Sequence, residues 1–409
     1  TDRIRRALGQ ALRANPQLMA KFGVDSTGRF TQTFPISAID MDEISIHEVA
    51  SAQEAREICW MKAAVPFNLE EGPAIAVDEI RINGYSTWFV LTMNEILIDG
   101  WGAMKFMEQL ISLFKCRNMD DQEIEVKTAM TSVLEYFQHL SKPKEISAEA
   151  RKFWSKSLDG VKSCFPLRDT LNNSCDPYAA SVIEVSLDDE ATAEIRSTAH
   201  ALSTSPFAVF VAAYSLALAA VSDQHDFVVG APVAGRNDEY EIGVPTLMLN
   251  MIAIRTRIDV EKKISDTVRS MISNVTEAVS FGDSVFSKVV SEFADHTNED
   301  PLFSTMVNML TYPSLEFWDG DRSLHLTELN TGFTKYDASL YIQRHGEDYT
   351  LQLAYKVAYV TPERANKVLA LTAWFLTSDW LSGKTTVANA IKTALNDCDT
   401  SQITMLKSY

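Results

Sequence analysis

The first half of the chain alternates between helical and extended hydrophobic patterns. Apolar residues at helical spacing predict a helix over residues 51–64. Alternating apolar and polar residues on both sides of Asn83-Gly84 predict a hairpin, because this dipeptide favours the tight turn between two antiparallel strands. A further helix is predicted from about Trp101 to Lys115.

The pattern is interrupted between residues 159 and 179, which are rich in Pro, Asn, Asp and Ser and show little periodicity. A new run of strands and helices begins with the strand-like segment 181–187 and ends with a helix from Pro362 to about Ser378. Because strands and helices mix on both sides of the interruption, we expect two α/β halves, 1–165 and 180–409, joined by a linker.

Composition narrows the classes of function. The chain has 409 residues, 46% hydrophobic and 22% charged, which is typical of a globular protein large enough for two domains. Its net charge of −18 argues against nucleic acid or an anionic membrane surface as a partner. The apolar stretch 206–221 is too short to span a bilayer and predicts a buried helix. Five scattered cysteines indicate reduced thiols in a cytoplasmic protein, without the spacing of a metal site.

Candidate chemistry lies in the segment LTMNEILIDGWGAMKFM, residues 91–107. Polar residues at the end of a buried strand are costly unless they are paired or functional, and here Asn94, Glu95 and Asp99 follow such a strand. If strand alternation continued, Glu95 and Asp99 would share one side and Asn94 would take the other. Gly100 permits a tight turn, and Trp101 begins the next helix. The alternative is that Asp99 only caps this helix while the other two face solvent.

The segment NEILIDGWG resembles the His-His-x-x-x-Asp-Gly motif of nonribosomal peptide synthetase condensation domains, with Asn94 and Glu95 at the histidine positions. Other segments resemble this family in the same order along the chain: PFNLEEGP from Pro66, RKFWSKSLDG from Arg151, FPLRD from Phe165, DFVVGAPVAGR from Asp226, LMLNMIAIRTRI from Leu247 and EDPLFSTMVNML from Glu299. The resemblance implies two pseudo-symmetric chloramphenicol-acetyltransferase-like α/β sandwich halves that form a V around a central tunnel.

The resemblance also implies a site. Glu95 and Asn94, together with Asp99, take the catalytic positions, and Asp99 and Arg255 form a structural ion pair. The residues expected to line the tunnel are Gly100, Trp101, Asn250, Asn308 and Thr311. No metal ion is expected.

The function implied is acyl transfer from a carrier-protein thioester to an amine, which forms an amide. The partners are then donor and acceptor peptidyl carrier proteins, whose phosphopantetheine arms replace a cofactor of the domain's own. Glu95 could accept a proton, as a stronger base if an apolar tunnel buries it, or hold a protonated amine as an ion pair.

Two alternatives stay open. The chain could be a non-catalytic platform that binds carrier proteins, other synthetase domains or a tailoring enzyme. It could also resemble heterocyclising relatives, whose motif is Asp-x-x-x-x-Asp. Asn94 and Asp99 come within one amide of that motif, but Gly102 stands where those relatives carry a serine.

Overall fold

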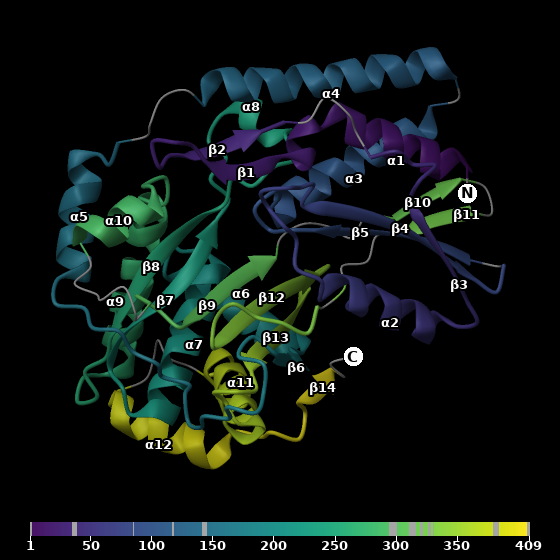
Figure 1. The fold of residues 1–409 in the computed structure, drawn as a ribbon. Coiled ribbons are helices and arrows are strands. Elements are labelled where there is room, and N and C mark those ends of the chain that lie inside the picture. Colours follow the sequence, from purple (N-terminus) through teal and green to yellow (C-terminus); the bar gives the residue numbers. More distant parts are fainter. Residues whose placement is uncertain are drawn as a thin grey trace.

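The computed structural model describes residues 2–34, 39–84, 86–116, 118–140, 145–293, 301–310, 316–319, 322–325, 329, 331–378 and 384–406. The chain forms a smaller and a larger half, each with its own β-sheet (Figure 1). The two sheets share no strand, so the prediction of two mixed α/β halves is confirmed.

The smaller half is built on a three-stranded sheet of β3 (Ser45–Val49), β4 (Ile75–Ile82) and β5 (Ser86–Met93). The predicted hairpin at Asn83-Gly84 is confirmed, since β4 and β5 pair as antiparallel neighbours. Ile80 of β4 packs against α2 (Ala52–Ala63) on one face. Val77 packs on the opposite face with α1 (Asp2–Ala14) and α3 (Gly100–Lys115), as strand alternation requires.

Several elements of this half were not predicted or were predicted too short. The segment SVLEYFQHL, residues 132–140, predicts a helix, and the structure shows a longer one, α4, which spans Met119–His139. A short 3-10 helix, η1 (Pro16–Met19), follows α1, and β1 (Lys21–Val24) pairs with β2 (Phe30–Thr33) in a separate hairpin.

The larger half contains a seven-stranded sheet in the order β14-β6-β13-β12-β9-β7-β8. Its strands are β6 (Ala180–Ser186), β7 (Asp226–Val233), β8 (Asn250–Arg257), β9 (Thr305–Leu310), β12 (Ala338–His345), β13 (Asp348–Lys356) and β14 (Thr404–Leu406). Its helices are α6 (Asp189–Ala201), α7 (Pro206–Ser222), α9 (Ile264–Ser280), α10 (Phe286–Phe293), α11 (Pro362–Leu376) and α12 (Val387–Asp397). The strands β10 (Glu316–Asp319) and β11 (Arg322–His325) form a hairpin outside this sheet.

The predicted buried helix is α7, which runs through the centre of the larger core. None of the helices in the described ranges is by itself long and apolar enough to cross a membrane. The helices α6 and α7, bent by 108° relative to each other, are long and apolar enough only when they are taken as a pair.

The helix α5 (Ala148–Leu158) precedes the predicted linker but packs into the larger core. Its Trp154 is 1% exposed and belongs to the same apolar cluster as Leu167 and residues of α7. The boundary at residues 165–180 therefore stays a prediction, because the apolar contacts of the larger half begin before it.

One segment of the larger half, residues 234–249 between β7 and β8, reaches the smaller half and is called the crossover segment below (Figure 1). It contains the short helix α8 (Glu239–Ile242). Its Val244 is fully buried against Val133 and Tyr136 of α4. The Nε2 atom of Gln17, after α1, donates to the Pro245 carbonyl at 2.9 Å. The crossover segment thus joins the two halves through both apolar and polar contacts.

We expect Trp154→Ala to lower the free energy of unfolding by about 3–5 kcal/mol, because it empties a large site in the core. Urea unfolding followed by circular dichroism measures this change. Lys152→Ala on the exposed face of the same helix is the control, with an expected change within about 0.5 kcal/mol. Equal effects of the two substitutions would contradict the packing of α5 into the larger core.

Candidate active site

The strand that leads into the site ends earlier than its alternation suggests. β5 stops at Met93, and the Oδ1 atom of Asn94 accepts a hydrogen bond from the backbone N–H of Ile96 at 3.0 Å. The Leu97 N–H donates to the Asn94 carbonyl at 3.0 Å, which closes a turn. The expectation that Glu95 and Asp99 share one side of a strand is therefore wrong, because the asparagine side chain stabilises a turn instead. Glu95 is exposed, whereas Asp99 is buried.

Asp99 accepts hydrogen bonds from both halves of the molecule. It is the N-cap of α3, and its Oδ1 accepts from the Gly102 N–H at 2.7 Å. Its Oδ2 accepts from the backbone N–H groups of Met248 and Leu249, in the crossover segment, at 2.8 and 2.9 Å. The guanidinium of Arg236 donates to Oδ2 at 2.8 Å and to Oδ1 at 3.0 Å. With both oxygens engaged in this way, Asp99 acts as a structural group.

The predicted pairing of Asp99 with Arg255 is wrong. Arg255 lies five residues into β8, about 17 Å along the strand from its first residue. Its guanidinium pairs instead with Asp226, at 2.7 Å for both contacts, and donates to the Asp159 carbonyl at 2.6 Å. The partner of Asp99 is the arginine at the end of the segment DFVVGAPVAGR, so the sequence contained a signal for it.

Glu95 lies at the tip of the turn without a hydrogen bond or ion pair to any residue that the structure describes. Its charge nevertheless acts on Tyr336, which belongs to the larger half. Burial raises the pKa of the Tyr336 phenol to about 12, and the charges of Glu95 and Tyr341 add to this effect. Tyr336 packs on Phe303, with ring centroids 5.4 Å apart. The site therefore contains a carboxylate from one half and a neutral phenol from the other.

Sequence reasoning missed Tyr336. It directly precedes Asp337 and β12, and no motif or spacing in the sequence relates it to the turn at Glu95. Only the packing of the two halves brings these residues into one site.

The predicted lining residues have different environments. Gly100 is exposed at the first position of α3. The indole Nε1 of Trp101 donates to the Ile242 carbonyl of the crossover segment at 3.0 Å. Asn308 is half-buried on β9, and Thr311 lies outside the described residues. Whether these residues line a tunnel stays a prediction.

Asn250, at the start of β8, has a structural role. Its Nδ2 donates to the carbonyls of Gly282 and Ser284 at 2.8 and 2.6 Å, and its Oδ1 accepts from the Phe286 N–H at 3.1 Å. These bonds tie the end of the crossover segment to the connection between α9 and α10. The amide of Asn250 is therefore committed to holding this loop.

Gly102 lies where α3 meets the crossover segment. A Cβ atom at this position would lie 2.7 Å from the Thr246 carbonyl oxygen and 2.9 Å from the Thr246 nitrogen. Both are backbone atoms, so they cannot move aside as a flexible side chain would. A serine at position 102, as in heterocyclising relatives, would displace the crossover segment.

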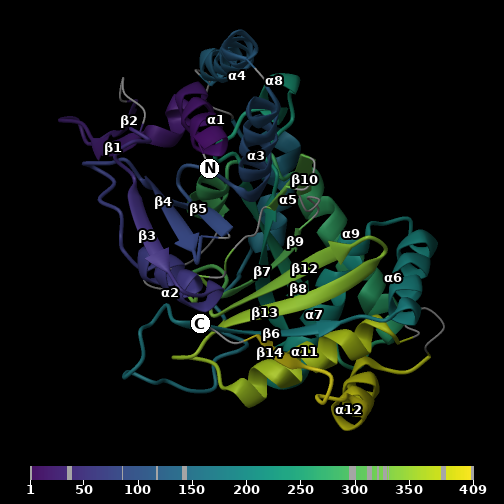
Figure 2. The same ribbon diagram turned by 90° about the vertical axis from the view of Figure 1, so that its right-hand side faces the viewer.

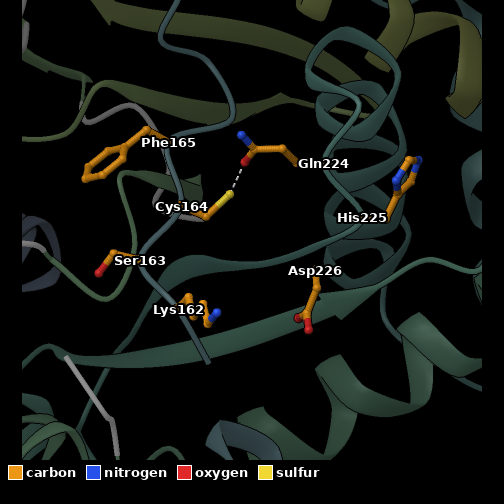
Figure 3. A pocket seen from close by; sticks show the side chains of 7 residues that line it. All are labelled: Lys162, Ser163, Cys164, Phe165, Gln224, His225 and Asp226. Atoms are coloured by element: carbon orange, nitrogen blue, oxygen red, sulfur yellow. Dashed lines mark hydrogen bonds between the residues drawn. The ribbon is translucent and has the colours of Figure 1, made fainter. Parts of the chain in front are cut away.

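A cavity of about 410 Å³ lies elsewhere, at the start of β7 (Figure 3). The Cys164 thiol donates to Oε1 of Gln224, and burial, with the charge of Asp226, raises the pKa of this thiol to about 11. The thiol is therefore protonated near neutral pH and is a poor nucleophile. β7 begins at Asp226 and runs toward Arg236, so this cavity lies at the opposite end of the strand from Asp99. The residues that line it are Lys162, Ser163, Cys164, Phe165, Gln224, His225 and Asp226.

Within the described ranges, no group of three or more His, Cys, Asp or Glu side chains is arranged to hold a metal ion.

Fold and site together define a two-half α/β protein in which an Asp-Gly turn of one half is clamped by a segment of the other. The family model for the condensation domain matches residues 1–369, and the chain belongs to this family.

Its curated relatives include large peptide synthases. Bacitracin synthase 1 of Bacillus licheniformis is 22% identical over 313 residues, which cover 74% of this chain and 6% of that protein. Tyrocidine synthase 3 of Brevibacillus parabrevis is 21% identical over 340 residues, which cover 82% of this chain and 5% of that protein. The chain thus corresponds to a small part of each relative, and the predicted resemblance to condensation domains of peptide synthetases is confirmed.

Solved structures agree with this fold. The condensation domain of the Monacolin K polyketide synthase MokA matches with a TM-score of 0.72 and 16% identity, over 95% of this chain and 91% of that one. The X-domain from teicoplanin biosynthesis matches with a TM-score of 0.69 and 13% identity, over 97% and 89% of the two chains. The predicted chloramphenicol-acetyltransferase-like fold class is confirmed.

We expect Asp99→Ala to lower the free energy of unfolding by about 3–5 kcal/mol, because Arg236, whose side chain is 3% exposed, would lose its buried partner. Urea unfolding provides the measurement. Glu347→Ala is the control, since this carboxylate is 70% exposed and its pairs with Arg196 and Arg344 are expected to contribute less than about 1 kcal/mol. A similar small loss in both variants would refute the structural role of Asp99.

Gly102→Ala tests the contact between α3 and the crossover segment. We expect it to lower Tm, because the added methyl group would collide with the backbone of Thr246. Gly243→Ala, in the crossover segment itself, meets no atom within 4 Å and should leave Tm nearly unchanged. Differential scanning calorimetry compares the two variants. If Gly102→Ala melts like Gly243→Ala, the close approach is not a constraint on the fold.

Proposed function

We propose that this chain is an acyltransferase that joins a carrier-bound acyl thioester to an amine acceptor and forms an amide. Its membership of the condensation domain family supports this proposal, as does its resemblance to parts of peptide synthases. Two carrier proteins, a donor and an acceptor, would present their substrates on phosphopantetheine arms. The chain would contribute the site where the two arms meet.

The observation that carries the proposal is the position of Glu95. Its turn is fixed by Asn94 on one side and by the buried Asp99–Arg236 pair on the other. Its side chain is exposed, and its charge helps to raise the pKa of Tyr336 of the opposite half. A carboxylate on a fixed turn can orient an incoming amine, and orientation alone contributes much of the rate of an acyl transfer.

The reaction needs a group that receives a proton. When the amine nitrogen attacks the thioester carbonyl carbon, the C–N bond forms and the nitrogen becomes positively charged. A carboxylate at Glu95 can accept the proton that the nitrogen then loses, while the C–S bond breaks and the pantetheine thiolate leaves. Because Glu95 is exposed, the apolar burial that would make it a stronger base is missing. Its negative charge is therefore suited above all to holding the amine in place.

Glu95→Gln tests this role, because glutamine keeps the shape of the side chain and removes its charge. We expect kcat to fall by about 10²–10⁴-fold if Glu95 accepts the proton. A rise in KM with unchanged kcat would instead mean that Glu95 only binds the protonated amine. The measurement loads donor and acceptor carriers and follows the condensed product by mass spectrometry. Glu57→Gln, on the exposed side of α2, is the control. Unchanged kcat and KM in Glu95→Gln would refute a role for Glu95.

A second candidate function is a non-catalytic platform that binds carrier proteins or a tailoring enzyme. It is favoured by Asn94, whose amide oxygen stabilises the turn, and by the absence of histidine from positions 94 and 95. This alternative predicts no product from the parent chain, with partner binding unchanged in Glu95→Gln. Activity that appears only in Glu95→His would show that the glutamate at position 95, in place of the motif histidine, is the reason the parent chain is inactive.

The heterocyclising alternative receives no support from the site. Position 102 has no space for the serine of those relatives, because a Cβ atom there would collide with the backbone of Thr246.

A further inference from the structure

The last residue of β13, Lys356, is a buried cation to which the proposed reaction assigns no role. Tyr355 before it is fully buried in the apolar core that includes residues of α7 and α11, so strand alternation turns Lys356 to the opposite face of the sheet. Figure 2 shows α11 and α12 on one side of this sheet and the smaller half on the other. Lys356 is only 8% exposed, although an ammonium group is costly to bury without a partner.

Aromatic rings and cations alternate around Lys356. Its Nζ lies 4.9 Å from the ring centroid of Tyr178 and 5.7 Å from that of Tyr359. The guanidinium carbon of Arg168 lies 4.6 Å from the Tyr359 centroid and 3.8 Å from the Phe165 centroid. These five residues, Phe165, Arg168, Tyr178, Lys356 and Tyr359, are called the cation-aromatic cluster below.

Backbone hydrogen bonds hold the three segments that supply this cluster. The Tyr359 N–H donates to the Lys356 carbonyl at 3.1 Å and closes a turn after β13. The N–H of Asp169, next to the cluster arginine, donates to the Tyr359 carbonyl at 3.1 Å. The Val357 N–H donates to the carbonyl of Ala179, the residue after the cluster tyrosine that precedes β6, also at 3.1 Å. The backbone therefore fixes the cluster without the help of a ligand.

The charges of the cluster are not balanced. The Asp337 carboxylate, 2% exposed, accepts from Nε of Arg168 at 2.6 Å and from its Nη2 at 3.2 Å. The Asp169 carboxylate accepts instead from the backbone N–H and the hydroxyl of Thr361. Within the described ranges, Nζ of Lys356 takes part in no hydrogen bond and no ion pair. One of the two positive charges of the cluster is thus left without a partner.

The aromatic rings do not replace an acceptor. An ammonium group has three N–H donors, and a ring face attracts its charge without offering a lone pair. Burial lowers the pKa of the Lys356 ammonium, and Asp337 opposes this effect whereas Arg168 adds to it. Nζ is not among the enclosed side-chain atoms that lack a partner, so it reaches the surface, and the neighbouring Tyr178 is 57% exposed. A ligand can therefore approach the ammonium group from solvent.

We propose that the cation-aromatic cluster binds an oxyanion, a carboxylate or a phosphate group, with Lys356 as the cation that receives it. This inference does not depend on the proposed acyl transfer. In this arrangement an oxygen of the ligand accepts hydrogen bonds from Nζ of Lys356, while Arg168 keeps the Asp337 carboxylate occupied. The tyrosine rings beside the ammonium group exclude water from it, which strengthens its attraction for an anion.

The test follows Lys356 by NMR in protein labelled with 13C at the Cε atoms of its lysines. Ring currents of the two tyrosines should separate this signal from those of exposed lysines, and Lys356→Met assigns it by its loss. We expect sodium acetate, sodium methyl phosphate or both to shift the signal until it saturates, relative to sodium chloride at the same ionic strength. The signal of the exposed Lys152 of α5 is the matched control and should show no saturable shift. The anion that binds more tightly identifies the group that the cluster prefers.

A variant of Asp337 leaves Lys356 intact and predicts a gain. Asp337→Asn removes the carboxylate that repels an incoming anion, so the affinity for the anion should rise about three- to tenfold. Glu190→Gln, at an exposed position at the start of α6, should leave this affinity unchanged. A bound anion also favours the charged ammonium, so a saturating anion should raise the pKa of Lys356 in a pH titration of the same signal.

The titration of the parent protein decides the inference even if Asp337→Asn were to unfold. No saturable shift of the Lys356 signal with either anion, or the same response at Lys152, would overturn it. An affinity in folded Asp337→Asn that is no higher than in the parent would also overturn it, because the anion would then bind away from this cluster.

Discussion

The carboxylate of Asp99 is the interaction on which the arrangement of the two halves depends. It caps α3 of the smaller half and also accepts two backbone hydrogen bonds and a guanidinium from the crossover segment of the larger half. A buried carboxylate is costly unless every lone pair is used, and this one is used by groups from both halves. The same contact explains Gly102, because only a glycine lets the backbone of Thr246 approach α3 so closely. Relative motion of the halves at this point would remove the carboxylate partner of Arg236 and of several N–H groups.

These hydrogen bonds of Asp99 determine which polar side chains of the turn at residues 94–98 can contact a ligand. The side-chain oxygen of Asn94 accepts a hydrogen bond within the turn, and both oxygens of Asp99 accept hydrogen bonds from α3 and the crossover segment. Glu95 is therefore the polar side chain of this motif that is free to contact a ligand. It reaches the site from a backbone that is held on both sides, which limits the entropy lost when a substrate binds. Tyr336 of the larger half, packed on Phe303, is a neutral group on whose pKa the charge of Glu95 acts. Under the proposed function, the chemistry of the site would depend on this one carboxylate.

Local patterns predicted those parts of the fold that local forces determine. The hairpin at Asn83-Gly84, the helix after Asp99 and the buried helix α7 follow from turn preference, capping and unbroken apolar character. Alternation failed beyond Met93, because the Asn94 side chain bonds to the backbone and competes with the strand. The prediction that Arg255 pairs with Asp99 failed for another reason. Arg236 also lies in a segment that resembles the family, and only the path of the crossover segment brings it to Asp99. Tyr336 could not be predicted, since its relation to the turn at Glu95 depends on the packing of the two halves.

The substitution of a carboxylate for a neutral imidazole changes more than the strength of a base. With the exposed Glu95 on its turn, the site carries a negative charge, in a chain whose net charge is already −18. Such a field attracts ammonium groups and weakens with ionic strength. An amine attacks only after it loses its proton, so a site that binds ammonium strongly also holds back the reactive form. The exposure of Glu95 moderates this conflict, because water screens its charge and allows proton exchange. A working site of this kind would therefore gain selectivity for cationic acceptors at some cost in rate.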